Sequence, residues 1–62
     1  MGIKKIKALR KSLGLNQSEF GQMVGLKKQS ISRYERGDRE PNLATIEKIA
    51  KALNVKISDI ID

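Results

Sequence analysis

Only three residues, Gly25, Leu26 and Lys27, separate two stretches of the sequence that have helical periodicity. A connection this short joins two helices through a sharp turn, because long antiparallel helices need a longer loop. Gly25 can take the positive φ that such a turn needs, and Gly21 omits a side chain where the helices must approach closely. The spacing therefore predicts a helix-turn-helix over residues 17–36, with an apolar interior made of Phe20, Val24, Ile31 and Tyr34.

Apolar residues at helical spacing predict one further helix on each side of this unit. In the earlier stretch, which ends at Gly14, the apolar positions are Ile3, Ile6, Leu9 and Leu13. In the later stretch, which Asn42 can cap, the apolar positions are Leu43, Ile46, Ile49, Ala50 and Leu53. Asn54 can then take the left-handed conformation that ends this helix.

The tail after Asn54 predicts a short fifth helix, although the alternation at Val55 and Ile57 also suits a strand. With five helices and no sheet, the predicted fold class is all-α. A chain of 62 residues has room for one small core. We therefore expect residues 1–62 to form a single compact domain.

The sequence contains neither cysteine nor histidine. This composition excludes disulfides, the commonest metal ligands and the usual general base at neutral pH. An enzyme would have to build its site from serines, lysines and scattered carboxylates, without a sheet to form a cleft. We expect no enzymatic activity, metal, cofactor or small-molecule ligand. No apolar run reaches the roughly 20 residues that span a bilayer, so a cytoplasmic location is expected.

The formal net charge of +6 is concentrated in the first three-fifths of the chain. Residues 1–36 carry nine basic and two acidic groups, whereas residues 37–62 carry four basic and five acidic groups. Such a gathered charge favours a polyanionic partner, either nucleic acid or an anionic membrane face. A membrane-surface role for the lysine-rich first helix is the weaker alternative, because its apolar face is needed for the core.

Residues 17–36 resemble the helix-turn-helix of the phage-repressor family, typified by the lambda and 434 repressors and their Cro proteins. The segments Leu-Arg-Lys-Ser-Leu-Gly-Leu-Asn-Gln at 9–17 and Tyr-Glu-Arg-Gly at 34–37 are similar to that family's strongest local signatures. The resemblance extends from Ile6 to Ile61, with Asn54 where glycine is more usual. It implies a five-helix domain whose third helix lies in the major groove of double-stranded DNA.

Helix geometry and this resemblance together indicate which side chains read bases. The face of the third helix opposite Ile31 and Tyr34 projects outward, and it carries Lys28, Gln29, Ser32 and Arg33. Gln29 can pair with adenine and Arg33 with guanine, Lys28 favours guanine acceptors, and Ser32 is permissive.

Further residues are expected at the DNA backbone. The resemblance assigns Gln17 to a phosphate, and the other candidates are Asn16, Lys11, Lys27, Ser30, Arg36 and Arg39. Lys27 stands where the family commonly places a capping Ser or Thr, and Lys28 follows it, so two cations oppose the dipole of the third helix. DNA phosphates would supply the missing anions. The alternatives are that these lysines are simply solvated, and that Gln17 is ordinary surface.

The resemblance also implies an ion pair between Arg10 and Glu35, which would fix the first helix relative to the third. If the pair is buried, removing one partner is expected to cost about 3 to 5 kcal/mol. If it is exposed, it contributes roughly 0 to 1 kcal/mol.

The leading hypothesis is a sequence-specific transcriptional regulator that represses from a palindromic operator as a homodimer. The alternative is an antitoxin-like protein that binds a protein partner and regulates its own promoter. The apolar tail either contacts a second subunit or completes the monomer core; its residues are Val55, Ile57, Ile60 and Ile61. The sequence leaves open whether the chain is a whole protein or the amino-terminal domain of a longer one.

Overall fold

The computed structural model describes residues 2–62, and over this range the chain forms four α-helices, one 3-10 turn and no β-strand. The elements, in chain order, are α1 (Ile6–Ser12), α2 (Gln17–Val24), α3 (Lys28–Arg36), α4 (Leu43–Leu53) and the turn η1 (Ile57–Asp59). The all-α fold class is therefore confirmed. The prediction of a fifth α-helix is wrong, because that segment is a 3-10 turn of three residues.

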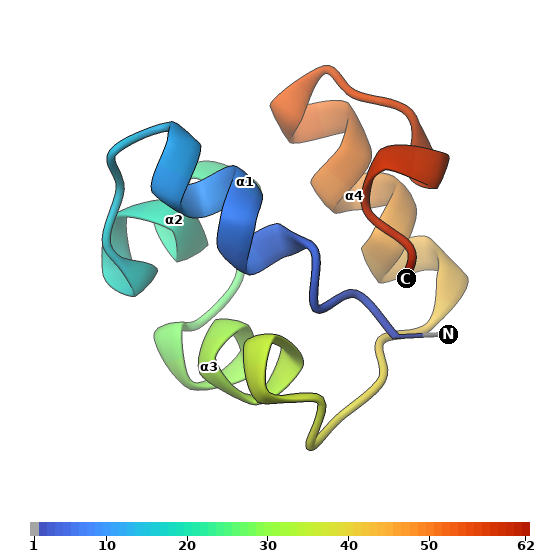
Figure 1. The fold of residues 1–62 in the computed structure, drawn as a ribbon, viewed down its shortest axis with the longest axis horizontal. Helices are drawn as coiled ribbons and strands as arrows, with labels where there is room; N and C mark the ends of the chain where they lie inside the picture. The colour runs from blue at the N-terminus through green and yellow to red at the C-terminus, as the bar shows by residue number, and fades with distance from the viewer. Residues whose placement is uncertain (1) are drawn as a thin grey trace.

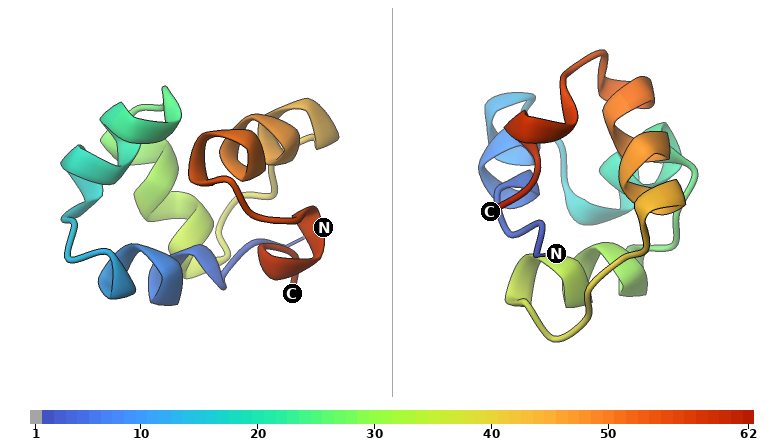
Figure 2. Two further views of the ribbon diagram at one scale, coloured as in Figure 1. Left: turned by 90° about the horizontal axis from the view of Figure 1, so that it is seen from above. Right: turned by 90° about the vertical axis from the view of Figure 1, so that its right-hand side faces the viewer.

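The path of the C-terminal tail explains this difference. The Ile60 N–H donates to the Ile57 carbonyl at 2.9 Å, which is the tighter bonding of a 3-10 turn. Beyond it the chain leaves the helical path, since the Asp62 N–H donates to the Gly2 carbonyl at 3.0 Å. Both views of Figure 2 place the C-terminus beside the start of the described part of the chain, far from the turn that joins α2 to α3. The hydrogen bond to the N-terminal segment thus draws the tail away from a helical path before a full α-helical turn can form.

The tight turn between α2 and α3 forms as the glycine pattern predicts. Gly25 ends α2 with φ +74°, the left-handed conformation that glycine takes without steric cost. At Gly21 a β-carbon would lie 2.6 Å from the Leu26 carbonyl oxygen, closer than any methyl group can approach. The two helices therefore pack at an angle that depends on glycine at both positions, with α3 along one edge of the molecule (Figure 1).

Two asparagines cap helices as predicted. The Asn16 Oδ1 accepts from the Glu19 N–H at 2.8 Å, and the Glu19 Oε1 accepts from the Asn16 N–H at 2.9 Å. This reciprocal capping box satisfies amide donors at the start of α2. The Asn42 Oδ1 accepts from the Thr45 N–H at 2.9 Å and caps α4 in the same way.

One hydrophobic core lies between the helices and the tail. Its buried residues are Ile3, Ile6, Phe20, Val24, Ile31, Tyr34, Ile46, Ile49, Ala50 and Ile60. Leu13 and Leu43, which the sequence placed on apolar helix faces, are instead 50% and 51% exposed. Leu13 follows the last residue of α1 and Leu43 is the first residue of α4, so neither lies where another element covers it. In residues 2–62 no helix is long and apolar enough to cross a membrane.

Candidate nucleic-acid interface

Helix α3 has one buried and one open face, as its sequence predicts. Ile31 and Tyr34 are 0% and 5% exposed and anchor the helix on the core. The opposite face carries the four side chains predicted to read bases. A shallow groove of about 410 Å³ runs along this face, and it is lined by Gln17, Lys28, Gln29, Ser32, Arg33 and Arg36.

The charge of this groove is positive. Among the described residues that line it are three cations, Lys28, Arg33 and Arg36, and no carboxylate. Gln17 reaches the groove from the start of α2, so two helices contribute to one surface. Such a surface attracts anions, and its amide and guanidinium groups can form paired hydrogen bonds.

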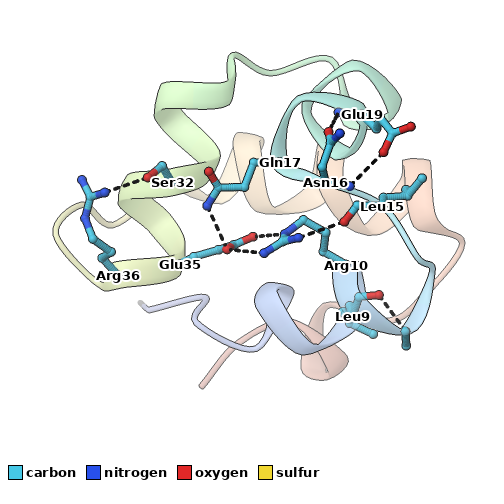
Figure 3. A network of polar contacts seen from close by, with 10 residues as sticks. Leu9, Arg10, Leu15, Asn16, Gln17, Glu19, Ser32, Glu35 and Arg36 are labelled. Atoms are coloured by element: carbon cyan, nitrogen blue, oxygen red, sulfur yellow. Dashed lines mark hydrogen bonds and ion pairs between the residues drawn. The ribbon is translucent and has the colours of Figure 1, made fainter.

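A buried ion pair between Arg10 and Glu35 connects α1 to α3, the helix that carries the groove (Figure 3). The Arg10 Nε donates to the Glu35 Oε2 at 2.7 Å, and the Arg10 Nη2 donates to the Glu35 Oε1 at 3.1 Å. The two side chains are 13% and 3% exposed, so the structure contains the buried version of the predicted pair and not the solvent-exposed one. Because Arg10 lies on α1 and Glu35 on α3, the pair holds the two helices together.

Two further contacts complete this network. The Arg10 Nη1 donates to the Leu15 carbonyl at 2.8 Å, in the connection between α1 and α2. The Gln17 Nε2 donates to the Glu35 Oε1 at 3.1 Å, which turns the Gln17 side chain toward the network while it still lines the groove. Gln17 is half-buried and hydrogen-bonded, so it is not ordinary first-turn surface.

The network keeps Glu35 charged. Burial by itself raises the pKa of Glu35, but the hydrogen bonds from Arg10 and Gln17 and the charges of Arg10 and Lys7 outweigh this effect and leave its pKa lowered. The hydrogen bond to Glu35 correspondingly raises the pKa of Arg10, although burial opposes the shift. The carboxylate in this basic helix is therefore neutralised by a neighbour instead of repelling an approaching anion.

The N-terminus of α3 lacks a capping side chain among the described residues. Lys27, at the N-cap position, has extended backbone with φ −75° and ψ 149°, and within residues 2–62 its side chain makes no capping hydrogen bond. Lys28 follows in the first turn, and both lysines are exposed. The positive end of the helix dipole therefore meets two positive side chains, which is an arrangement suited to a bound anion.

The sequence also matches a known protein family. A model described as "Helix-turn-helix" matches residues 6–60, which include every helix described above. The chain belongs to this helix-turn-helix family. Together with the likeness to the P22 c2 repressor, this match confirms the resemblance to phage repressors that the sequence suggested.

Relatives of this helix-turn-helix chain include regulators and an antitoxin. The HTH-type transcriptional regulator YgzD of Bacillus subtilis is 38% identical over 56 residues, which are 90% of this chain and 85% of that protein. The antitoxin PezA of Streptococcus pneumoniae is 41% identical over 58 residues, but these are 94% of this chain and only 37% of that protein. The chain therefore spans most of one relative and about a third of the other.

Solved structures agree with this membership. One of them is the P22 c2 repressor, from a Salmonella phage, in complex with a synthetic operator. The match covers 100% of this chain and 96% of the repressor chain, with a TM-score of 0.84 and 32% sequence identity. The names of this repressor, YgzD and PezA describe regulators and an antitoxin, and none of the three names an enzyme.

The remaining residues predicted for the DNA backbone lie outside the groove of this helix-turn-helix domain. Among residues 2–62, the groove lining takes in Gln17 and Arg36 but not the other five, which are Asn16, Lys11, Lys27, Ser30 and Arg39. Ser30 is half-buried and the other four are exposed. The Asn16 side-chain oxygen is engaged in the capping box, so that residue acts first as a cap.

The tail residues divide between the core and the surface. Ile60 is 0% exposed and packs inside its own chain, so for this residue the structure shows the second alternative, completion of the monomer core, and not a dimer contact. Ile60 directly follows the 3-10 turn, and its side chain is part of the hydrophobic core. Val55, Ile57 and Ile61 pack against the same core but stay half-buried.

Several contacts that shape this site escaped the sequence analysis. Lys7 adds charge near Glu35, and the Lys48 Nζ donates to the Gly25 carbonyl at 3.1 Å, which stabilises the turn. The Arg36 Nε donates to the Asp38 Oδ2 at 2.7 Å. Only the last had a local signal, because Asp38 follows Arg36 across one glycine.

Proposed function

We propose that this chain is a sequence-specific, double-stranded DNA-binding transcriptional regulator that acts as a repressor. In the proposed complex, α3 lies in the major groove and the start of α2 lies on the phosphate backbone. The observation that carries the proposal is the positive groove along α3, whose lining joins the four predicted base-reading side chains to Gln17 and Arg36. An α-helix fits the major groove of B-form DNA, where each base pair presents a distinct pattern of donors and acceptors.

The base-reading roles follow from the chemistry of the exposed α3 side chains. Gln29 can donate to and accept from an adenine edge, and Arg33 can donate twice to a guanine edge. Each such pair contributes about 1 to 3 kcal/mol of discrimination against a wrong base. Lys28 favours guanine acceptors, and Ser32 lies between these residues on the same face.

The phosphate contacts provide affinity without sequence preference. Gln17 lies at the start of α2, where free amide donors and the helix dipole favour a phosphate. The other residues proposed to act at the backbone are Asn16, Lys11, Lys27, Ser30, Arg36 and Arg39. Each neutralised phosphate should steepen the dependence of log affinity on log salt concentration by about 0.9.

We further propose that the protein binds a palindromic operator as a homodimer. Half-sites in such operators lie about one helical turn apart, so two copies of α3 can enter successive major grooves. Val55, Ile57 and Ile61 support this proposal, because these apolar side chains remain half-buried after the monomer core is complete. The likeness to the P22 c2 repressor in complex with a synthetic operator gives further support.

Enrichment from a random duplex DNA pool at near-physiological salt tests the whole proposal. We expect a two-fold symmetric motif with half-sites about 10 base pairs apart. Arg33→Ala should relax the preference at one base pair in each half-site. Lys51→Ala is the matched control, since Lys51 is an exposed cation on α4 that lies outside the α3 groove. Equal losses for Arg33→Ala on specific and scrambled duplexes would show that Arg33 only contacts phosphate.

The antitoxin-like alternative is favoured by one observation, the 41% identity to PezA. The matching region covers 37% of PezA, so this identity supports the alternative through that part of PezA alone. Six of the nine basic residues in 1–36 are lysines, which argues against a purely protein-facing function because lysine is depleted in the cores of protein interfaces. Failure to enrich any motif would shift the proposal toward a protein partner.

A further inference from the structure

Arg36 connects an acidic side chain to one of the residues proposed to read bases, and Figure 3 shows its hydrogen bond to Ser32. Its Nη1 donates to the Ser32 Oγ at 2.7 Å, and its Nε donates to the Asp38 Oδ2 at 2.7 Å. The two donors belong to one planar guanidinium, so its orientation is fixed by both partners at once. The bond to Ser32 lies inside the groove along α3, since both residues line it.

Local geometry explains why these three residues meet. Ser32 and Arg36 are four positions apart on α3 and therefore share one face of the helix. Gly37 then takes φ +78°, and the Asp38 N–H donates back to the Arg33 carbonyl at 3.0 Å. This C-terminal cap returns the chain toward the last turn of α3 and brings the Asp38 carboxylate to Arg36.

The bond from Arg36 constrains the Ser32 hydroxyl. A hydroxyl group has one hydrogen to donate and two lone pairs, whereas a guanidinium can only donate. Since Arg36 donates to Ser32, the hydroxyl hydrogen must point away from Arg36. A hydroxyl that accepts from a cation is also polarised into a better donor.

We propose that Arg36, held by Asp38, is a positioning residue that makes Ser32 a hydrogen-bond donor in base recognition. This inference rests on the proposed function, and it replaces the permissive role of Ser32 by a directional one. A donor in the major groove favours bases that present acceptors, which are guanine, adenine at N7 and thymine at O4, over the amino group of cytosine. Arg36 therefore influences sequence preference through Ser32, in addition to any phosphate contact.

The hydrogen bonds from Arg36 to Ser32 and Asp38 are expected to be stronger in the DNA complex than in the free protein. The Arg36 and Asp38 side chains are 59% and 58% exposed, so water weakens their interaction in the free chain. At a protein–DNA interface, water is partly excluded and the local dielectric constant falls, which strengthens the same hydrogen bonds. Pairing with Arg36 also neutralises Asp38, which would otherwise repel phosphates.

Base-preference profiles of variants, obtained by selection from the random duplex pool, test this inference. Ser32→Ala identifies the base pair that Ser32 reads. Arg36→Lys retains the positive charge but cannot donate from two fixed nitrogens. We expect Arg36→Lys to reduce the ratio of preferred to non-preferred bases at that same base pair by roughly threefold to tenfold. The double variant Ser32→Ala/Arg36→Lys should show no further change there, and Asp38→Asn should shift the profile in the same direction.

Lys51→Arg is the matched control, because Lys51 is an exposed cation on α4 that lies outside the groove. It should leave every base preference unchanged. Thermal melting of each variant checks that the fold is retained. If Arg36→Lys weakens all sequences equally and keeps the wild-type profile, Arg36 is only a phosphate contact and the inference is overturned. An unchanged profile for Ser32→Ala would also overturn it. Absence of any motif with the wild-type chain would instead overturn the proposed function itself.

Discussion

Arg10 and Glu35 are 25 positions apart in the chain, yet their side chains form two hydrogen bonds of 2.7 and 3.1 Å (Figure 3). Gln17 donates to the same carboxylate, so α1, α2 and α3 meet at one buried group. The position of α3 relative to the two other helices therefore depends on a single charged network. This dependence makes the network a direct test of how the candidate interface is held.

Arg10→Met should destabilise the domain by about 3 kcal/mol or more, because it leaves the buried Glu35 carboxylate without its cation. Urea unfolding at neutral pH measures this free energy. Arg36→Met is the matched control, since it removes an exposed ion pair that contributes roughly 0 to 1 kcal/mol. Similar losses of unfolding free energy in the two variants would contradict the expectation that the buried pair contributes more than the exposed one.

Stability should fall at acidic pH partly through Glu35. Its pKa is lowered in the folded chain from an ordinary value of 4.5, so the unfolded chain binds this proton more tightly. The corresponding stability is present above that value and is lost as the pH falls through the lower folded pKa. Urea unfolding from about pH 7 to about pH 3 should show this loss. Glu35→Gln should be less stable at neutral pH and less sensitive to acid; an unchanged slope would contradict the assignment.

Gly21→Ala should destabilise the domain even though alanine is the better helix former. A β-carbon at this position would lie 2.6 Å from the Leu26 carbonyl oxygen, and the backbone must shift to admit it. Overpacking of this kind costs about 1 to 3 kcal/mol, against a gain in helix propensity of about 1 kcal/mol. We expect a net loss in thermal melting together with weaker DNA binding. Gln22→Ala, at the exposed neighbouring position, should show neither effect.

Lys27→Ser should stabilise the free domain and weaken the DNA complex. Serine supplies the missing cap of α3 and removes a cation that opposes the helix dipole, for a gain of about 1 kcal/mol. Loss of a positive charge next to the phosphates should reduce affinity for all sequences alike. Denaturant unfolding and binding at two salt concentrations measure the two effects. A variant that is more stable and binds DNA equally well would show that Lys27 is simply solvated.

Helix ends and the turn between α2 and α3 were predictable because their causes are local. The Asn16 and Asn42 caps act within three residues, and Gly25, Gly37 and Asn54 end helices through their own left-handed backbone. The polar face of α3 was equally readable, since burial of Ile31 and Tyr34 leaves only one way for the neighbouring side chains to point.

Contacts between side chains at the site were harder to predict from the sequence. The partner of Arg10 was inferred from a resemblance, and its burial became known only from the structure. The bond from Arg36 to Ser32 depends on a side-chain rotamer that Asp38 selects, and helical spacing alone does not choose between that rotamer and one directed at a phosphate. These contacts decide which groups of the groove are free to form further hydrogen bonds.

By itself, the sequence determined where α2, α3 and α4 begin and end, which face of α3 is polar, and the sign of the charge near it. The helix ends and the polar face depend on residues within about one helical turn of each other, so they do not require knowledge of distant contacts. Tertiary structure alone decided that Leu13 and Leu43 stay exposed, that Ile60 is buried and that the tail is a 3-10 turn. These outcomes depend on which distant segments cover a given residue, and coverage is a property of the assembled core, not of local periodicity.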